Sequence, residues 1–284
     1  MFLPTTITEV RERGWDELDV IIFSGDAYID HPAFGPAVIG RILEAEGYRV
    51  AIVPQPNWRD DLRDFRKLGQ PRLFFAVTAG AMDSMVNHYT ANLRLRSNDA
   101  YTPGGKAGFR PDRAVDTYTR ILKRLYPHTP VVVGGIEASL RRLTHYDYWT
   151  NSLRRSVLVS SGADLLIYGM GDKVIREVAR AMRNGFNMKL LRGLRQVGFR
   201  ADREYVERLD VKTTLHLHSF EECCASNEAF GKNFVEEETL SNMMSCDTTL
   251  VEAVDDGYVV ITPPHVTLTT EELDHPFDLP YERA

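Results

Sequence analysis

The 284-residue sequence contains only three cysteines, Cys223, Cys224 and Cys246. Three thiols cannot build the disulfide framework of a secreted protein, so we expect a reducing cytoplasm. No apolar run approaches the roughly 18 residues of a membrane span, and the N-terminus lacks the basic-then-apolar order of a signal peptide. The modest content of glycine (20) and proline (14) excludes collagen-like and disordered chains. We therefore expect a cytoplasmic α/β protein without a membrane partner.

Charge is distributed unevenly, although the net charge is only −6. Residues 94–208 carry 22 Lys and Arg against 11 Asp and Glu, whereas residues 219–284 carry 2 against 15. Such a contrast indicates either an anionic ligand on the basic segment or an acidic tail packed against it, and we favour the second. A nucleic-acid partner is not expected, because no reader motif accompanies the scattered basic residues.

Short apolar runs recur along the first 170 residues, each followed by a turn signal and most by an amphipathic stretch. Runs this short and continuously apolar are typical of a parallel sheet buried on both faces. The runs are 18–23, 48–53, 73–77, 131–133 and 163–168, and the helical stretches are 33–46, 59–67, 112–126 and 173–184. The alternation predicts an α/β fold with a doubly wound, mostly parallel, Rossmann-like sheet.

The C-terminal third has a different pattern. Residues 211–218 alternate like a half-exposed strand, and Ser219 with Glu222 resembles a capping box. Residues 258–261 are another strand candidate, and residues 267–284 read as a polar linker without a core-forming period. We expect an α/β domain over residues 1–209 and an acidic, irregular α+β extension and linker over residues 210–284.

Four loops that follow the predicted strands are rich in small and polar residues. Ligands of doubly wound sheets bind where loops leave the carboxyl ends of the strands, and glycines let the backbone approach a ligand. Tight βα turns are the alternative explanation for each glycine taken alone. The candidate cofactor-binding residues are Asp26, Asp30, His31, Gly80, Asp83, Ser84, Gly134, Gly135, Glu137, Gly169, Gly171 and Asp172.

The densest polar cluster is Asp26, Asp30 and His31. A carboxylate beside an imidazole suits acid–base chemistry, a metal or a cofactor. Alternatively, Asp30 caps the following helix and His31 makes a local hydrogen bond. No further His or Cys stands at ligand spacing, so we predict no metal site there.

Two other clusters invite a functional reading. His216 and His218 precede the adjacent cysteines, but this spacing matches no ordinary zinc pattern, and structural roles are favoured. Two arginine pairs, 141–142 and 154–155, flank the aromatic segment 144–149. That segment suits a planar anionic ligand, although packing against the acidic tail is the favoured reading.

Several stretches together resemble the N-terminal region of YgiQ-type radical-SAM proteins. They are FLPTT, GWDELDVIIFSGDAYIDHPAFGPAVIGRILEAEGYRVAIVPQPNW, SNDAYTPGGKAGFRPDRA, VVVGGIEASLRRLTHYDYW, LLIYGMGDK and ELDHPFDLPYERA, and they cover nearly the whole chain. The first long block also resembles the opening helix of cobalamin-binding-like domains. VVVGG and YGMGDK occupy the places of the glycine-rich loops of those domains.

The resemblance implies a cobalamin-binding-like domain, followed in full-length relatives by a radical-SAM barrel. A Cys-x3-Cys-x2-Cys loop of that barrel holds a [4Fe-4S] cluster that binds S-adenosylmethionine. The three cysteines of this chain form no such triplet. We therefore expect a chain truncated before the barrel, with the barrel as its partner in cis, and with no cofactor and no radical chemistry of its own.

A bound cobalamin remains open at this stage. Binders that hold cobalt through histidine resemble an Asp-x-His-x-x-Gly pattern, whereas here Asp30 and His31 are adjacent. Two main hypotheses follow: an accessory domain of a radical-SAM enzyme of unknown substrate, or a stand-alone module. The module would bind a nucleotide-like or corrinoid small molecule at the carboxyl edge of the sheet.

Overall fold

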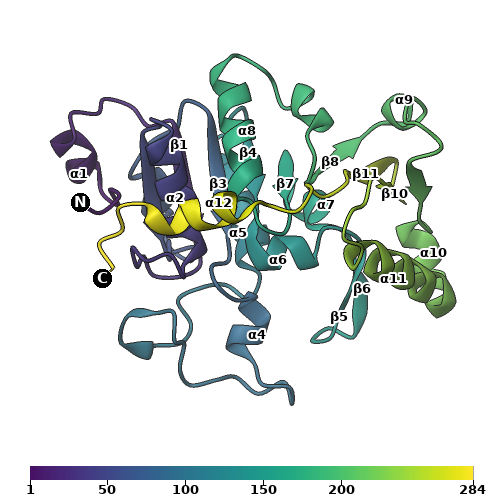
Figure 1. Ribbon diagram of the computed structural model, residues 1–284. Coiled ribbons are helices and arrows are strands. Elements are labelled where there is room, and N and C mark those ends of the chain that lie inside the picture. Colours follow the sequence, from purple (N-terminus) through teal and green to yellow (C-terminus); the bar gives the residue numbers. More distant parts are fainter. Residues whose placement is uncertain (284) are drawn as a thin grey trace.

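One nine-stranded sheet forms the centre of the computed structural model, which describes residues 1–283 (Figure 1). The strand order is β2-β1-β3-β4-β7-β8-β11-β10-β9. The strands are β1 (Val20–Ser24), β2 (Val50–Pro54), β3 (Phe74–Thr78), β4 (Val131–Val133), β7 (Leu165–Ile167), β8 (Val197–Ala201), β9 (Thr214–His216), β10 (Thr249–Val254) and β11 (Gly257–Ile261). A separate antiparallel hairpin pairs β5 (His145–Asp147) with β6 (Ser152–Arg154).

The first five strands of that order run parallel, and all five lie at the predicted apolar runs. Alternate residues of each strand enter separate cores: Ile21 and Phe23 face one, Val20 and Ile22 the other. Helices cover both faces, as a doubly wound sheet requires. In the order β2-β1-β3-β4-β7 the progression of the strands across the sheet reverses between β1 and β3. Doubly wound folds bind ligands at such a reversal. The predicted fold class is confirmed.

Helices α2 (Gly35–Ala45) and α8 (Asp172–Arg183) cover the core that contains Val20 and Ile22. Helices α5 (Ala114–Leu125) and α7 (Val157–Ser161) cover the core that contains Ile21 and Phe23. The other helices connect or cap strands. They are α1 (Ile7–Glu12), α3 (Arg63–Arg66), α4 (Ser84–His88), α6 (Gly135–Leu140), α9 (Arg203–Val206), α10 (Phe220–Ala225), α11 (Asn227–Ser241) and α12 (Thr270–Asp274). Three 3₁₀ turns complete the chain: η1 (Pro103–Gly105), η2 (Leu190–Gly193) and η3 (His275–Asp278). No helix within residues 1–283 has both the length and the apolarity needed to cross a membrane.

Several elements differ from the sequence-based expectation. The helix predicted over 59–67 shrinks to α3, because Leu62 adopts a left-handed conformation (φ 61°) that delays the helix start. Strands β8 and β10 were not predicted; both pair antiparallel with β11. The capping box at Ser219 is confirmed and begins α10. The domain boundary at 209 and 210 stays a prediction, although β9 to β11 lie beyond it and pair into the same sheet.

The segment predicted to be a linker contains two packed elements, α12 and η3. Thr269 and Glu272 form a reciprocal capping box that begins α12. We call residues 266–283 the strap. In Figure 1 the strap is yellow and crosses from the β11 side of the molecule to the N-terminus, so that both chain ends lie together.

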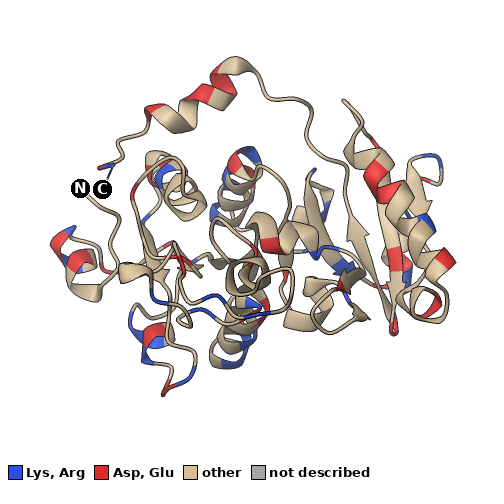
Figure 2. Cartoon of the chain, turned by 90° about the horizontal axis from the view of Figure 1, so that it is seen from below, with Lys and Arg blue, Asp and Glu red and all other residues tan. Residues whose placement is uncertain are grey.

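The acidic segment packs on the basic one, as the charge pattern predicts. Red segments mark the strap helix and α11 in Figure 2. Four ion pairs connect the two segments: Arg142–Glu237, Arg155–Asp255 at 2.8 Å, Lys173–Glu272 at 2.9 Å and Arg195–Asp247 at 2.7 Å. The acidic segment therefore neutralises four basic side chains of residues 94–208.

Candidate functional site

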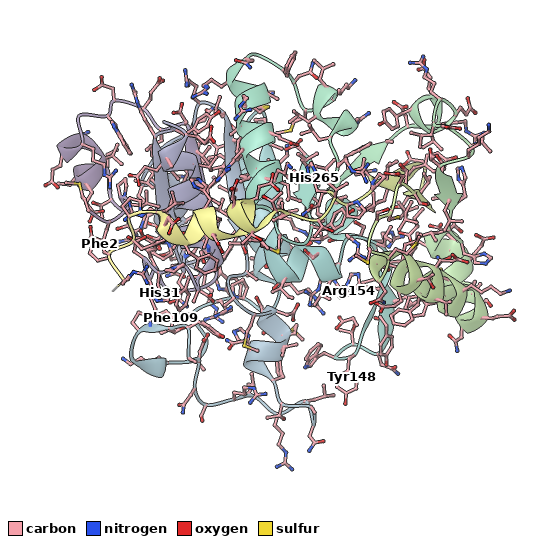
Figure 3. All side chains as sticks on the ribbon, viewed as in Figure 1. Phe2, His31, Phe109, Tyr148, Arg154 and His265 are labelled. Atoms are coloured by element: carbon pink, nitrogen blue, oxygen red, sulfur yellow. The ribbon has the colours of Figure 1, made fainter. Side chains whose placement is uncertain are left out.

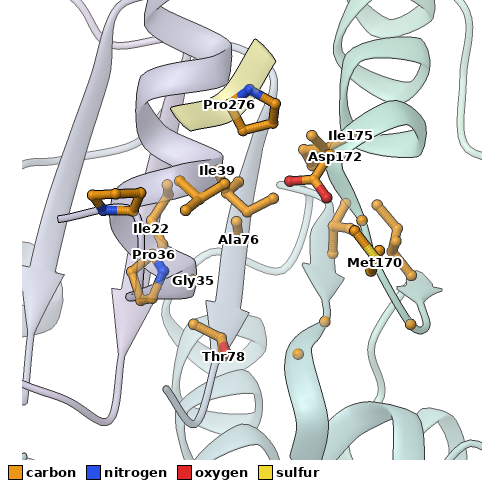
Figure 4. A pocket seen from close by; sticks show the side chains of 18 of the residues that line it. Ile22, Gly35, Pro36, Ile39, Ala76, Thr78, Met170, Asp172, Ile175 and Pro276 are labelled. Atoms are coloured by element: carbon orange, nitrogen blue, oxygen red, sulfur yellow. The ribbon is translucent and has the colours of Figure 1, made fainter. Parts of the chain in front are cut away.

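A crevice of about 440 Å³ lies at the carboxyl edge of the parallel strands (Figure 4). Its walls are mostly aliphatic side chains and glycine backbone. The lining includes Ile22, Ile39, Ala76, Val132, Ile167 and Ile175 together with Gly80, Gly134, Gly135, Gly169 and Gly171. The structure thus brings all five predicted glycines into one cavity at the β1/β3 switch. Binding of a cofactor by these residues stays a prediction.

Two of these glycines are required by the geometry. Gly135 has a φ of +82°, and a Cβ there would lie 2.5 Å from the Oγ1 of Thr78. Gly80 has a φ of +103°, and its added Cβ would lie 2.1 Å from the Cγ of Asp26. Any larger residue would therefore strain the backbone and collide with a neighbour. These loops hold bare backbone against the cavity.

The strap closes the outer side of the crevice. Leu268, Leu273, Pro276 and Phe277 line the cavity opposite the strand ends. Asp172, the first residue of α8, also lines it, and Figure 4 shows its carboxylate pointing into the cavity beside Pro276. Burial raises the pKa of Asp172 above its ordinary value. Among the described residues that line this crevice, the charged groups are Asp172 and Glu272, both acidic.

Asp30 anchors the end of the strap. Its side chain is fully buried and forms an ion pair with Arg41, whose Nε lies 3.0 Å from Oδ1. The backbone N–H of Glu282 donates to Asp30 Oδ2 at 2.9 Å, and the N–H of Arg283 donates to the Asp30 carbonyl at 2.9 Å. The alternative that Asp30 caps the next helix is wrong, because α2 begins after Phe34 without a side-chain cap.

His31 lies outside the lining of the crevice and makes the local contact that the sequence suggested as an alternative. The backbone N–H of Ala33 donates to its Nδ1 at 3.1 Å. In Figure 3 His31 lies below Phe2, on the side of the molecule where the two chain ends meet. This position does not suit a histidine that holds cobalt inside the crevice, so the residues present do not fit a histidine-ligated corrinoid.

Asp26 belongs to a buried ion-pair network instead of the cavity wall. Its Oδ1 lies 2.6 Å from Arg110 Nη2, and the N–H of Ala81 donates to its Oδ2 at 2.6 Å. Arg110 also contacts Asp99 at 3.3 Å and donates to the Ala79 carbonyl at 3.0 Å. Burial raises the pKa of Asp26, and the neighbouring guanidinium opposes that rise. The network holds the loop that carries Gly80.

Asp83, Ser84 and Glu137 hold helix N-termini. Asp83 accepts from the N–H groups of Met85 and Val86 at the start of α4. The carboxylate of Glu137 accepts from the N–H of Ser84 at 3.1 Å and of Val115 at 2.9 Å. Burial raises the pKa of Glu137. These residues position the loops around the crevice rather than lining it.

The histidine–cysteine cluster of the C-terminal third is structural. Cys223 is buried, and Asn233 Nδ2 donates to its Sγ at 3.2 Å. Burial raises the pKa of this thiol to about 11, so it stays protonated. Cys224 is exposed and Cys246 is buried elsewhere. Within residues 1–283 no group of three His, Cys, Asp or Glu side chains is arranged to hold a metal ion, and the cysteines do not fit an iron–sulfur cluster.

The sequence analysis did not predict that the strap closes the outer side of the crevice. A signal was present: the Thr-x-x-Glu pattern at 269–272 predicts a helix start, and apolar residues follow at 273, 276 and 277. It also missed Arg41 and Arg110, which pair with the predicted aspartates. Arg110 lies 84 residues from Asp26 in the sequence, and spacing alone cannot connect them.

The protein-family model described as radical SAM N-terminal matches residues 2–284 of this chain. The chain belongs to that family. This radical-SAM N-terminal chain is 56% identical over 282 residues to a UPF0313 protein of Porphyromonas gingivalis, covering 99% of this chain and 44% of the relative. It is 54% identical over 293 residues to a UPF0313 protein of Bacteroides thetaiotaomicron, covering 99% and 47%. The chain therefore spans less than half the length of these curated relatives, and the predicted resemblance is confirmed.

Among solved structures, the radical-SAM N-terminal chain is similar to the radical S-adenosylmethionine methyltransferase TsrM of Kitasatospora setae, whose structure contains tryptophan substrate and a SAM analogue. The TM-score is 0.42 at 19% identity, over 65% of this chain and 28% of that chain.

Proposed function

We propose that this chain is the N-terminal accessory part of a radical-SAM iron–sulfur enzyme and is not catalytic alone. The observation that carries the proposal is the family match over residues 2–284 in a chain that spans 44% of its relative. When bound, a [4Fe-4S] cluster supplies an open iron at which S-adenosylmethionine is cleaved to a radical. The cluster ligands would come from the part of the protein outside these 284 residues.

The role of this chain's own residues is to hold a rigid edge beside the catalytic part. Asp30 and Arg41 clamp the end of the strap, and the buried Asp26–Arg110 pair holds the Gly80 loop. Sites built on such fixed elements keep their geometry when a second domain docks. The strap would then guide the chain from the sheet edge toward the catalytic part.

Comparison of the full-length protein with residues 1–284 tests this proposal. After anaerobic reconstitution with iron and sulfide, we expect the full-length protein to hold about four iron atoms and to release 5′-deoxyadenosine from S-adenosylmethionine. Residues 1–284 should do neither. Cys224→Ala in the full-length protein is the matched control, because Cys224 is exposed and should leave the iron content unchanged. Cluster binding by residues 1–284 alone would refute the proposal.

A second candidate function is ligand binding in the crevice itself. The cavity of about 440 Å³ falls within the roughly 300–1,000 Å³ of small-molecule pockets. Its apolar walls and acidic charged groups disfavour a phosphate, so a neutral nucleoside suits it better than a nucleotide or a corrinoid.

Equilibrium dialysis with adenosine and with cobalamin tests this candidate. We expect adenosine to be retained and cobalamin not. Leu273→Ser should weaken adenosine binding, because it removes an apolar side chain that lines the cavity. Leu190→Ser, at an exposed position on η2, is the control. If the parent chain does not retain adenosine, this function is excluded.

A further inference from the structure

We propose that a second cavity, which we call the arginine hollow, binds a phosphate-bearing small molecule. The hollow measures about 600 Å³ and lies between α4, the loop 89–113, the start of α5 and Trp58 with Arg59. Arg154, labelled in Figure 3, lines it from the β5–β6 hairpin. It is separate from the crevice and does not rest on the proposed function above.

Charge is the first argument. The lining contains six arginines, Arg59, Arg96, Arg110, Arg113, Arg120 and Arg154, and three aspartates, Asp99, Asp112 and Asp116. Four of the arginines have carboxylate partners: Arg110 with Asp26 and Asp99, Arg113 and Arg154 with Asp147, and Arg120 with Asp116.

Two guanidiniums are left without a carboxylate within 4 Å among residues 1–283. Arg59 donates to the Gly108 carbonyl at 3.0 Å, and Arg96 donates to the Tyr89 carbonyl at 3.2 Å. Backbone carbonyls do not neutralise a full charge. The hollow therefore keeps positive charge.

Buried nitrogen atoms without partners are the second, independent argument. Asn87 is 6% exposed and His88 is 7% exposed, and both line the hollow. His88 Nε2 and Trp58 Nε1 are buried and make no hydrogen bond among residues 1–283, whereas the side chain of Asn87 hydrogen-bonds Asp99 and helps to lower the pKa of that carboxyl. Buried polar groups are normally satisfied, so these two nitrogens in one cavity point to a polar ligand.

His88 is held in a defined orientation. Its Nδ1 lies 2.8 Å from Asp112 Oδ1, and Tyr89 Oη donates to the other oxygen of Asp112 at 3.0 Å. The carboxylate therefore fixes the orientation of the ring, and Nε2 is the ring nitrogen left for a ligand. Such an oriented ring is costly to leave without a partner.

The chemistry of the donors selects phosphate over carboxylate. A phosphate group carries nearly two negative charges and at least three acceptor oxygens, whereas a carboxylate carries one charge and two oxygens. The two guanidiniums without a carboxylate partner match the first better. The indole of Trp58 beside Arg59, whose Cζ lies 4.4 Å from the ring centroid, offers a planar surface for an organic group.

Isothermal titration calorimetry at low salt tests the proposal with pyrophosphate and AMP as probes. We expect saturable binding of both to the 284-residue chain. The double variant Arg59→Ala/Arg96→Ala should bind about tenfold more weakly or worse, because charge-assisted hydrogen bonds are lost. His88→Gln should weaken binding as well, and thermal melting will show whether it folds. Arg59 and Arg96 are exposed, so replacing them should leave the fold intact. Weaker binding by the double variant would therefore report on the hollow itself.

The control is Arg94→Ala, an exposed arginine on the same loop that does not line the hollow; it should bind as the parent does. An equal loss from Arg94→Ala and from the double variant Arg59→Ala/Arg96→Ala would show diffuse surface charge and overturn the proposal. So would equally tight binding of succinate. Binding of an RNA oligonucleotide without binding of AMP or pyrophosphate would assign the hollow to nucleic acid and overturn it too.

Discussion

Arg110→Met is expected to lower the free energy of unfolding by about 4 kcal/mol, because removing one partner of a buried ion pair leaves uncompensated charge. The Arg110 side chain is fully buried and lies between Asp26 and Asp99, each 1% exposed. Methionine keeps an unbranched apolar side chain but leaves both carboxylates without a cation. Urea unfolding at pH 7 measures the loss.

The matched control is Arg208→Met, which removes an ion pair with Glu204 in which both side chains are 74% exposed. Exposed pairs contribute about 0–1 kcal/mol, so this variant should unfold almost as the parent does. The defect of Arg110→Met should shrink at low pH, where Asp26 and Asp99 take up protons. Similar losses for the two variants would show that the buried network does not hold the fold.

Glu252→Gln is expected to stabilise the protein by up to about 3 kcal/mol at pH 8 and to change little near pH 4.5. Glu252 lies on β10 with 1% of its surface exposed, and its carboxyl accepts from the N–H of Thr144 at 3.0 Å. Burial, reinforced by Glu237 and Glu221, raises its pKa from 4.5 to about 7. Glutamine mimics the protonated form at every pH.

The direction follows from proton linkage. The folded state holds the Glu252 proton more tightly than the unfolded state, so the stability that this carboxyl contributes is complete below pH 4.5 and falls as pH rises to about 7. The difference between Glu252→Gln and the parent, measured by urea unfolding from pH 4.5 to 8, isolates this group. Glu236→Gln, at an exposed position on α11, removes the same charge and should show no such trend. A flat difference for Glu252→Gln would contradict the prediction.

Both predictions concern charged residues whose role the sequence could not assign. Glu252 sits in a strand that sequence reasoning did not find, because its glutamate interrupts the apolar run of TLVEAV. β8 was missed for a similar reason, since Gly198 and Arg200 break the apolar pattern of a five-residue strand. In each case pairing with β11 makes the strand, and sheet hydrogen bonds form between segments distant in sequence.

The parallel half of the fold was predictable because its signal is local. A strand buried on both faces must be apolar at every position, and the runs at β1, β2 and β3 show this directly. Helices α2, α5 and α8 follow within one or two residues of the predicted bounds, since each carries an amphipathic period. The glycines of the crevice were found for the same reason, as each follows a strand immediately.

The sequence by itself determined the parallel half of the sheet, the glycine loops at its carboxyl edge and the family. Only the tertiary structure decided which polar residues line a cavity and which are consumed in ion pairs. Asp26 and Asp30 are paired with Arg110 and Arg41, whereas His88 keeps an unpartnered Nε2 in the arginine hollow. The physical reason is that the sequence gives the chemical type of each side chain. Its burial and its partners depend on segments that only folding brings together.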